Sequence, residues 1–134
     1  MKRRIFATLI SVLFFAVICA AKTYHLTNDP SVPAASGKLE TDHDHNGNTK
    51  LSLKVYNLAK PANLTPAKNT YVVWIQPNGQ PAQNLGELKL GDQLKGEFEG
   101  VTSAQSFDLF VTAEDNATAA APSGTELLKT RVQQ

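Results

Sequence analysis

The chain has 134 residues, which is enough for one domain but not two. Its formal net charge is +1 at pH 7, and Lys2, Arg3 and Arg4 supply three of its 13 basic residues. Without these three, ten basic residues stand against 12 acidic ones, and this mildly acidic balance argues against nucleic acid or an anionic membrane as the main partner. The only cysteine is Cys19, so the sequence beyond it can form no disulfide and no thiolate metal site.

Residues 1–21 have the layout of a secretory signal peptide: a cationic start, an apolar run over 5–21 and small residues at its end. The apolar run of about 17 residues is at the lower limit for crossing a bilayer, so an uncleaved membrane anchor is the alternative. A lipid on Cys19 is a third hypothesis, disfavoured by the bulky Ile18 before it. We therefore expect a periplasmic or secreted protein, or one that is membrane-anchored and faces outside the cytoplasm.

The remaining residues are predicted as a flexible lead over 22–34, which contains Pro30 and Pro33, and one β domain over 35–134. Alternating or strongly apolar runs bounded by turn residues predict seven strands, at 35–41, 50–58, 70–76, 85–90, 94–99, 106–114 and 126–132. This pattern is typical of an immunoglobulin-like antiparallel β-sandwich, with a closed barrel as second choice. The first and last of these strands are expected at exposed edges, where a second copy could pair.

Turn residues predict how several of these strands are connected. Asn46-Gly47 supplies the two positive-φ residues of a tight type I′ hairpin turn. The short Gly91-Asp92 turn predicts a second hairpin between 85–90 and 94–99. Residues 59–69, with two prolines, are expected as a crossover loop, and residues 115–124 as a mobile or loosely draped loop.

The run at 70–76 is aromatic or β-branched almost throughout, which indicates a central strand buried on most of both faces. Trp74 and Phe110 are expected in the core between the two sheets, where large aromatic side chains contribute most of the burial.

One segment, 42–48, is dense in side chains that can bind metal. Its opening matches the start of an EF-hand calcium loop, but the position that needs a bidentate carboxylate is Leu53, so that interpretation fails. His43 and His45, two residues apart, could share one strand face with Asp44 nearby as a weak transition-metal site. The favoured interpretation is a polar hairpin tip whose Asp and Asn side chains cap backbone donors.

Catalytic motifs are not found. The sequence has no G-x-S-x-G motif, no glycine-rich phosphate loop and no thiol nucleophile beyond residue 21. Carboxylate pairs such as Glu97 and Glu99 are interpreted as solvated strand faces. We expect a protein that is not an enzyme and that has no cofactor.

Residues 71–75, followed by Pro77, Gly79 and the run 86–88, resemble the extracytoplasmic domain of anti-sigma-K factors. The run 107–114, with Val-Thr-x-Glu at its end, and the Pro-Ser-Gly turn at 122–124 resemble the same family. The resemblance covers about 60 residues, over 71–128, and implies a small sandwich outside the membrane, in a protein whose cytoplasmic part holds a sigma factor. Because only residues 1–4 precede the apolar segment, we expect no sigma-binding domain here, and the family supplies no catalytic or ligand residues.

The sequence thus predicts an exported, non-enzymatic sandwich that binds another protein or an envelope component; the alternative is a periplasmic metal-binding protein that uses His43 and His45. Loops on rigid sandwiches usually carry the binding residues. Two segments, the 78–82 turn and the 115–123 loop, are therefore the candidate contact surface, with these candidate residues: Asn78, Gln80, Asn116 and Ser123.

Overall fold

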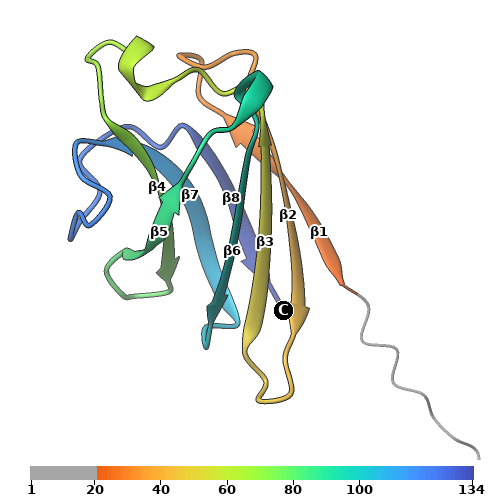
Figure 1. Ribbon diagram of the computed structural model, residues 1–134. Coiled ribbons are helices and arrows are strands. Elements are labelled where there is room, and N and C mark those ends of the chain that lie inside the picture. Colours follow the sequence, from red (N-terminus) through yellow and green to blue (C-terminus); the bar gives the residue numbers. More distant parts are fainter. Residues whose placement is uncertain (1–20) are drawn as a thin grey trace, which may run out of the picture.

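The computed structural model describes residues 21–134, and they form an all-β fold of eight antiparallel strands (Figure 1). The strands are β1 (Lys22–Asn28), β2 (Ser36–His43), β3 (Thr49–Tyr56), β4 (Thr70–Pro77), β5 (Gln83–Leu88), β6 (Gly96–Thr102), β7 (Ser106–Glu114) and β8 (Leu128–Gln133). Two single 3-10 turns, η1 (Pro61–Asn63) and η2 (Asp92–Leu94), lie in the connections. The prediction of an all-β domain is confirmed. The predicted signal peptide and Cys19 lie outside the described residues, except for Ala21.

The sheet curls until it nearly closes into a barrel, with the strand order β5-β4-β7-β8-β1-β2-β3-β6. Its two ends, β5 and β6, are not paired as strands; one isolated bridge, Leu90–Gly96, joins the segment after β5 to the start of β6. Beyond that bridge the ring of Phe98 on β6 fills the space over Gly86 on β5, where a Cβ atom would lie 3.1 Å from the ring. A side chain rather than a ladder of hydrogen bonds therefore spans this gap.

Residues 22–28 correct the predicted flexible lead, because they form β1. Its residues Lys22 to Leu26 pair with β2, and Thr27 and Asn28 pair with β8. Leu26 is buried and the hydroxyl of Tyr24 donates to the carbonyl of Gln133 at 2.8 Å. β1 thus joins the two halves of the sheet. The sequence did not indicate this strand, because residues 22–28 are mostly polar and Pro30 and Pro33 follow them.

Two predictions about strand pairing are also wrong. β5 and β6 do not form a hairpin, because β5 pairs with β4 while β6 pairs with β3. The backbone between them turns through Gln93 and Leu94, both at positive φ, and passes from one half of the sheet to the other. The strands expected at the edges, β2 and β8, are interior, and the edges are β5 and β6.

The other hairpin is confirmed in its pairing, since His43 of β2 lies opposite Thr49 of β3. Its turn is longer than the type I′ turn expected. Within this turn only Gly47, and not Asn46, has a positive φ. The amide of Gly47 donates to the carbonyl of Asp44 at 3.2 Å.

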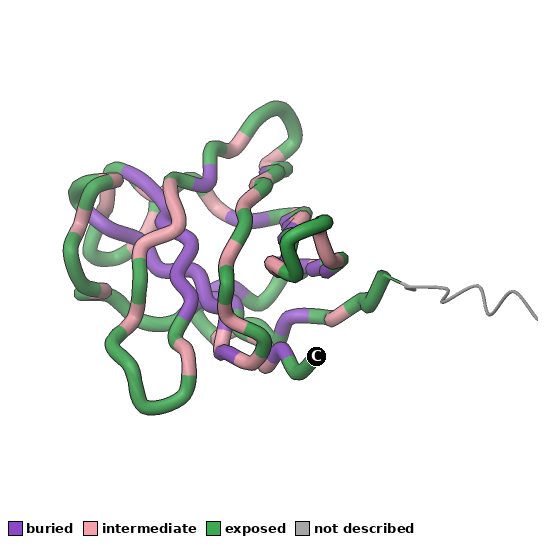
Figure 2. The backbone as a smooth tube through the Cα atoms, turned by 90° about the horizontal axis from the view of Figure 1, so that it is seen from below, coloured by how far each residue is buried: buried purple, intermediate pink, exposed green. Residues whose placement is uncertain are grey.

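The main core lies inside the curled sheet, where alternate residues of the strands meet (Figure 2). β4 is a central strand, as predicted, with Thr70 to Ile75 all buried. Tyr71, Val73 and Ile75 face the main core, whereas Val72 and Trp74 form a second cluster with Phe110 of β7. The expectation that Trp74 and Phe110 lie in the inter-sheet core is therefore wrong. The period of two along each strand places them on the outer face of β4 and β7.

Within residues 21–134, no helix has the length and apolar character that crossing a membrane requires.

Candidate functional site

The hairpin tip holds the residues proposed for metal binding, and its geometry is that of a capped turn. The Asp44 carboxylate accepts the amides of Asn46 and Asn48, at 2.8 and 2.9 Å, and the side-chain amide of Asn48 at 3.0 Å. These hydrogen bonds hold the pKa of Asp44 below its ordinary value. β2 ends at His43, so His45 lies in the turn and the two imidazoles do not share a strand face. No group of three or more potential ligands occurs among residues 21–134.

The segment 115–124, which we term the strap, connects β7 to β8 and lies over the outer face of β4 and β5. Ala119 of the strap packs against the cluster of Val72, Trp74 and Phe110. The side-chain amide of Asn84 on β5 donates to the carbonyls of Ala117 and Ala119, each at 2.9 Å. These contacts fix the strap, so the prediction of a loosely draped loop is wrong.

A series of hydrogen bonds ties the strap to the outer cluster. The indole N–H of Trp74 donates to the Thr112 hydroxyl at 2.8 Å, and that hydroxyl donates to Glu114 at 2.6 Å. The Glu114 carboxylate also accepts the amide of Ser123, at 2.9 Å, and the hydroxyl of Ser123. Gly124 follows in close contact, because a Cβ atom there would lie 2.8 Å from the carbonyl oxygen of Ala113.

Glu114 is a buried carboxylate, 2% exposed, whose charge is satisfied by these donors. Burial by itself raises the pKa of Glu114, but the hydrogen bonds from Ser123, Thr112 and the amides of Ser123 and Gly124 outweigh it and leave the pKa below its ordinary value. All of its partners are groups of the fold itself. Glu114 therefore acts as a structural anchor for the strap.

The four candidate contact residues lie in two places. Asn116 accepts the amide and the hydroxyl of Thr118 within the strap, and Ser123 binds Glu114. Asn78 and Gln80 lie in the turn between β4 and β5. The structure therefore does not bring the four residues together.

Asn78 and Gln80 line a surface hollow, which we term the end hollow, between the 77–80 turn and the 102–106 turn. Its lining carries no charged side chain and is as follows: Pro77, Asn78, Gln80, Gln83, Thr102, Ser103, Ala104, Gln105 and Ser106. Gln105 donates to the carbonyl of Gly47 at 2.9 Å, and Thr49 donates to that of Ala104 at 3.0 Å. The 102–106 turn is thus held against the β2–β3 hairpin, and the hollow has one fixed wall.

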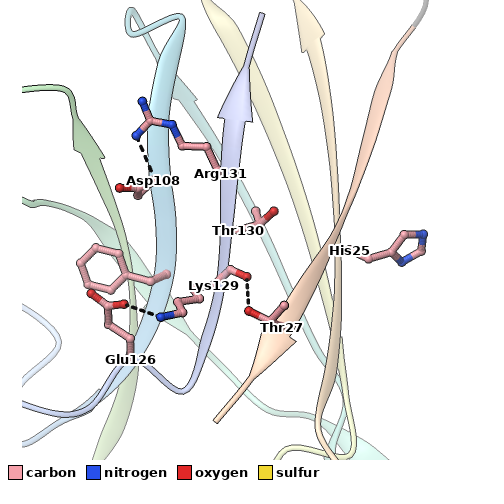
Figure 3. A pocket seen from close by; sticks show the side chains of 8 residues that line it. His25, Thr27, Asp108, Glu126, Lys129, Thr130 and Arg131 are labelled. Carbon is pink, nitrogen blue, oxygen red and sulfur yellow. Dashed lines mark hydrogen bonds and ion pairs between the residues drawn. The ribbon is translucent and has the colours of Figure 1, made fainter.

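A second hollow lies on the outer face of β7, β8 and β1 (Figure 3). Its charges are matched, because Arg131 pairs with Asp108 at 3.0 Å and Lys129 with Glu126 at 3.7 Å. His25 points away from both pairs in Figure 3. The two side chains of an exposed ion pair attract each other only weakly. Even so, each charge here has its partner, so neither pair leaves a charge that an ionic ligand would neutralise.

Arg131 lines the second hollow and also contacts Asn78, which lines the end hollow. One nitrogen of its guanidinium donates to Asp108, and another donates to the Oδ1 atom of Asn78. No local pattern indicates this contact, since Arg131 is 53 residues from Asn78.

Sequence reasoning also missed the hydrogen bonds that lead from Trp74 to Ser123. The Val-Thr-x-Glu and Pro-Ser-Gly runs contain three of the residues involved, but their pairing depends on the path of the strap. A buried tryptophan needs a partner for its N–H, and that requirement was the one available signal.

No protein-family model matches the sequence, and no curated protein matches it.

Proposed function

We propose that this protein is an exported, non-enzymatic binding module, and that the end hollow contacts a protein partner or another envelope component. The observation that carries this proposal is the uncharged, hydrogen-bonding lining of a hollow between two turns of a rigid β fold. Within residues 21–134 the side chains of Gln80, Gln83, Ser103 and Ser106 make no hydrogen bond to the protein, so they are available to a ligand.

Site-specific photo-crosslinking in cells of the native host tests this proposal. A crosslinker at position 80 or 103 should give one defined adduct. The same crosslinker at Ser52 or Lys54, on the outer face of β3, should give none. Equal yields at all four positions, or adducts only at the control positions, would contradict the proposal.

We also propose that residues 1–21 are a signal peptide, with an uncleaved anchor as the alternative. In support, strand β1 begins at Lys22, directly after the small residues of the proposed cleavage site. The intact mass of the protein from fractionated cells distinguishes the two. A mass that starts near Lys22 in the soluble envelope fraction supports cleavage, and the full-length mass in the membrane fraction supports the anchor.

The finer fold assignment, an immunoglobulin-like sandwich, rests on strand order. In support of this proposal, β2-β3-β6 and β5-β4-β7-β8 follow the strand order expected for A-B-E and C′-C-F-G in such a sandwich, while β1 lies between them and joins them into one sheet. The resemblance to the outer domain of anti-sigma-K factors stays a proposal. In this protein, four of the residues that carry it are joined by hydrogen bonds: Trp74, Thr112, Glu114 and Ser123.

A further inference from the structure

We propose that Asn78 is a site of spontaneous deamidation, which converts the uncharged rim of the end hollow into an anionic one. The inference does not depend on the proposed function, because it follows from the chemistry of an Asn-Gly pair in an exposed turn. The sequence has two such pairs, Asn46-Gly47 and Asn78-Gly79. The structure distinguishes between them.

In this reaction the backbone nitrogen of Gly79 attacks the Cγ atom of Asn78. A bond forms between these two atoms, the Gly79 amide loses its proton, and the Cγ–Nδ2 bond of Asn78 breaks to release ammonia. Water then opens the resulting five-membered imide at either carbonyl, which leaves an aspartate or an isoaspartate. Glycine favours the attack because it has no Cβ to hinder the approach of its nitrogen.

The two pairs are sterically alike. Asn46, Gly47, Asn78 and Gly79 are all in surface turns, and both glycines are exposed. Both glycines have positive φ, at 77° and 70°, and a Cβ atom on either would have no neighbour within 4 Å. Neither turn therefore obstructs ring closure more than the other.

The attacking nitrogen differs in its hydrogen bonding. The amide of Gly47 donates to the carbonyl of Asp44 at 3.2 Å, so this bond must break before the nitrogen can attack. In the part of the protein that the structure describes, the amide of Gly79 donates no hydrogen bond. The bond that closes its turn runs instead from the amide of Gln80 to the carbonyl of Pro77, at 3.1 Å.

The carbonyl that is attacked also differs. The Arg131 guanidinium donates to the Oδ1 atom of Asn78. A cationic donor at this oxygen draws electron density from Cγ and stabilises the negative charge that develops on the oxygen during attack. No cationic group among residues 21–134 donates to the Oδ1 atom of Asn46.

The product changes the local electrostatics. A carboxylate at position 78 would share the Arg131 guanidinium with Asp108, which already lies 3.0 Å from it. A new negative charge would stand beside Gln80 on the rim of the end hollow. A partner that fits an uncharged rim would then bind less tightly, and a different partner could be preferred.

Peptide mapping by mass spectrometry of the whole protein, incubated in its folded state at mildly alkaline pH, tests the inference. We expect deamidation at Asn78 to be about 25-fold faster than at Asn46. About fivefold corresponds to the net free energy of the one hydrogen bond that only the Gly47 amide must break, and about fivefold comes from the Arg131 donor. In strong denaturant the two rates should converge. Equal rates in the folded protein, or a faster rate at Asn46, would overturn the proposal.

The Arg131→Gln variant tests the part assigned to the guanidinium. The rate at Asn78 should fall by about fivefold, less than the roughly hundredfold cost of losing a buried oxyanion donor, because this pair is exposed. The rate at Asn46 should not change. If the variant deamidates faster at Asn78, Arg131 restrains the side chain instead of activating it, and that part of the proposal is wrong. The variant should keep its fold, because β8 is held in the core by Leu128 and Val132.

Discussion

The indole N–H of Trp74 donates to the hydroxyl of Thr112 at 2.8 Å, on the outer face of the sheet and beneath the strap. This bond connects an aromatic cluster with Glu114, the carboxylate that holds the strap in place. The strap thus covers a second buried cluster on the outer face of the sheet, and the predictions for Trp74, Glu114 and Gly124 test that arrangement.

Trp74→Ala should lower the free energy of unfolding by about 3–5 kcal/mol, because it leaves a cavity under the strap and removes a partner of the Thr112 hydroxyl. Trp74→Phe should cost roughly 2 kcal/mol, since the ring is retained in part and one hydrogen bond is lost. Urea unfolding of both variants is followed by circular dichroism. Trp74 is the only tryptophan, so tryptophan fluorescence is lost in both variants. Gln76→Ala, at an exposed position of the same strand, is the control and should change stability by less than about 0.5 kcal/mol.

Protease sensitivity shows whether the loss acts through the strap. In Trp74→Ala, cleavage within residues 115–124 should appear before cleavage elsewhere. Uniform cleavage throughout the protein would mean that Trp74 supports the whole sheet and not the outer layer.

Glu114→Gln should reduce stability at neutral pH by about 1–3 kcal/mol, because charge-assisted hydrogen bonds become neutral ones. The pKa of Glu114 is lower in the folded protein than its ordinary value of 4.5, so its charged form stabilises the fold above that pH. The contribution is lost as the pH falls through the folded pKa. The stabilities of wild type and variant should therefore converge in acid.

Unfolding measured across this pH range, with exposed Glu126→Gln as control, checks the expectation. If the difference in the free energy of unfolding between wild type and Glu114→Gln stays constant into strong acid, the negative charge of Glu114 is not what holds the strap.

Gly124→Ala should destabilise the protein by about 1–3 kcal/mol, because the added Cβ atom would lie 2.8 Å from the Ala113 carbonyl oxygen. Gly91→Ala is a matched control, since the nearest atom there is 3.8 Å away. Melting temperatures of the two variants measure the effect. Similar losses in both would show that the contact at Gly124 does not determine the path of the strap.

Tyr71→Phe should cost about 1 kcal/mol, because the Tyr71 hydroxyl donates to the carbonyl of Ala59 at 2.5 Å and fixes the 59–69 crossover against β4. Burial raises the pKa of Tyr71 to about 12. Ultraviolet titration of the folded protein should therefore show a tyrosinate step near that pH. The step should disappear in Tyr71→Phe and persist in Tyr56→Phe.

The local features that can be predicted from sequence are those in which neighbouring residues determine the outcome. The alternation of Leu51, Leu53 and Val55 with polar residues predicts β3 and its buried face, and the structure has both. The glycine and asparagine residues of the 42–48 segment predict a turn between two paired strands. The proline, asparagine and glycine at 77–79 likewise predict a turn at the surface, which is where Asn78 and Gln80 lie.

The pairing of distant segments could not be predicted in the same way. Two alternating runs with a short turn between them can form a hairpin or can belong to different halves of a sheet. Here the two runs belong to different halves of the sheet, and the backbone between them is left-handed at Gln93 and Leu94. Similarly, a polar run such as Lys22–Asn28 becomes a strand only because β2 and β8 offer free edges to it.

The sequence by itself determined that the fold is all-β, the positions of seven of the eight strands and the uncharged character of the 77–83 turn, since these depend on residues near one another along the backbone. Only the tertiary structure decided that Trp74 lies on the outer face, that Glu114 holds Ser123, and that Arg131 reaches Asn78. Each of these depends on which face of the sheet a loop crosses and on which strands are neighbours. Those choices are made by the burial of apolar surface over the whole domain, and no local pattern records them.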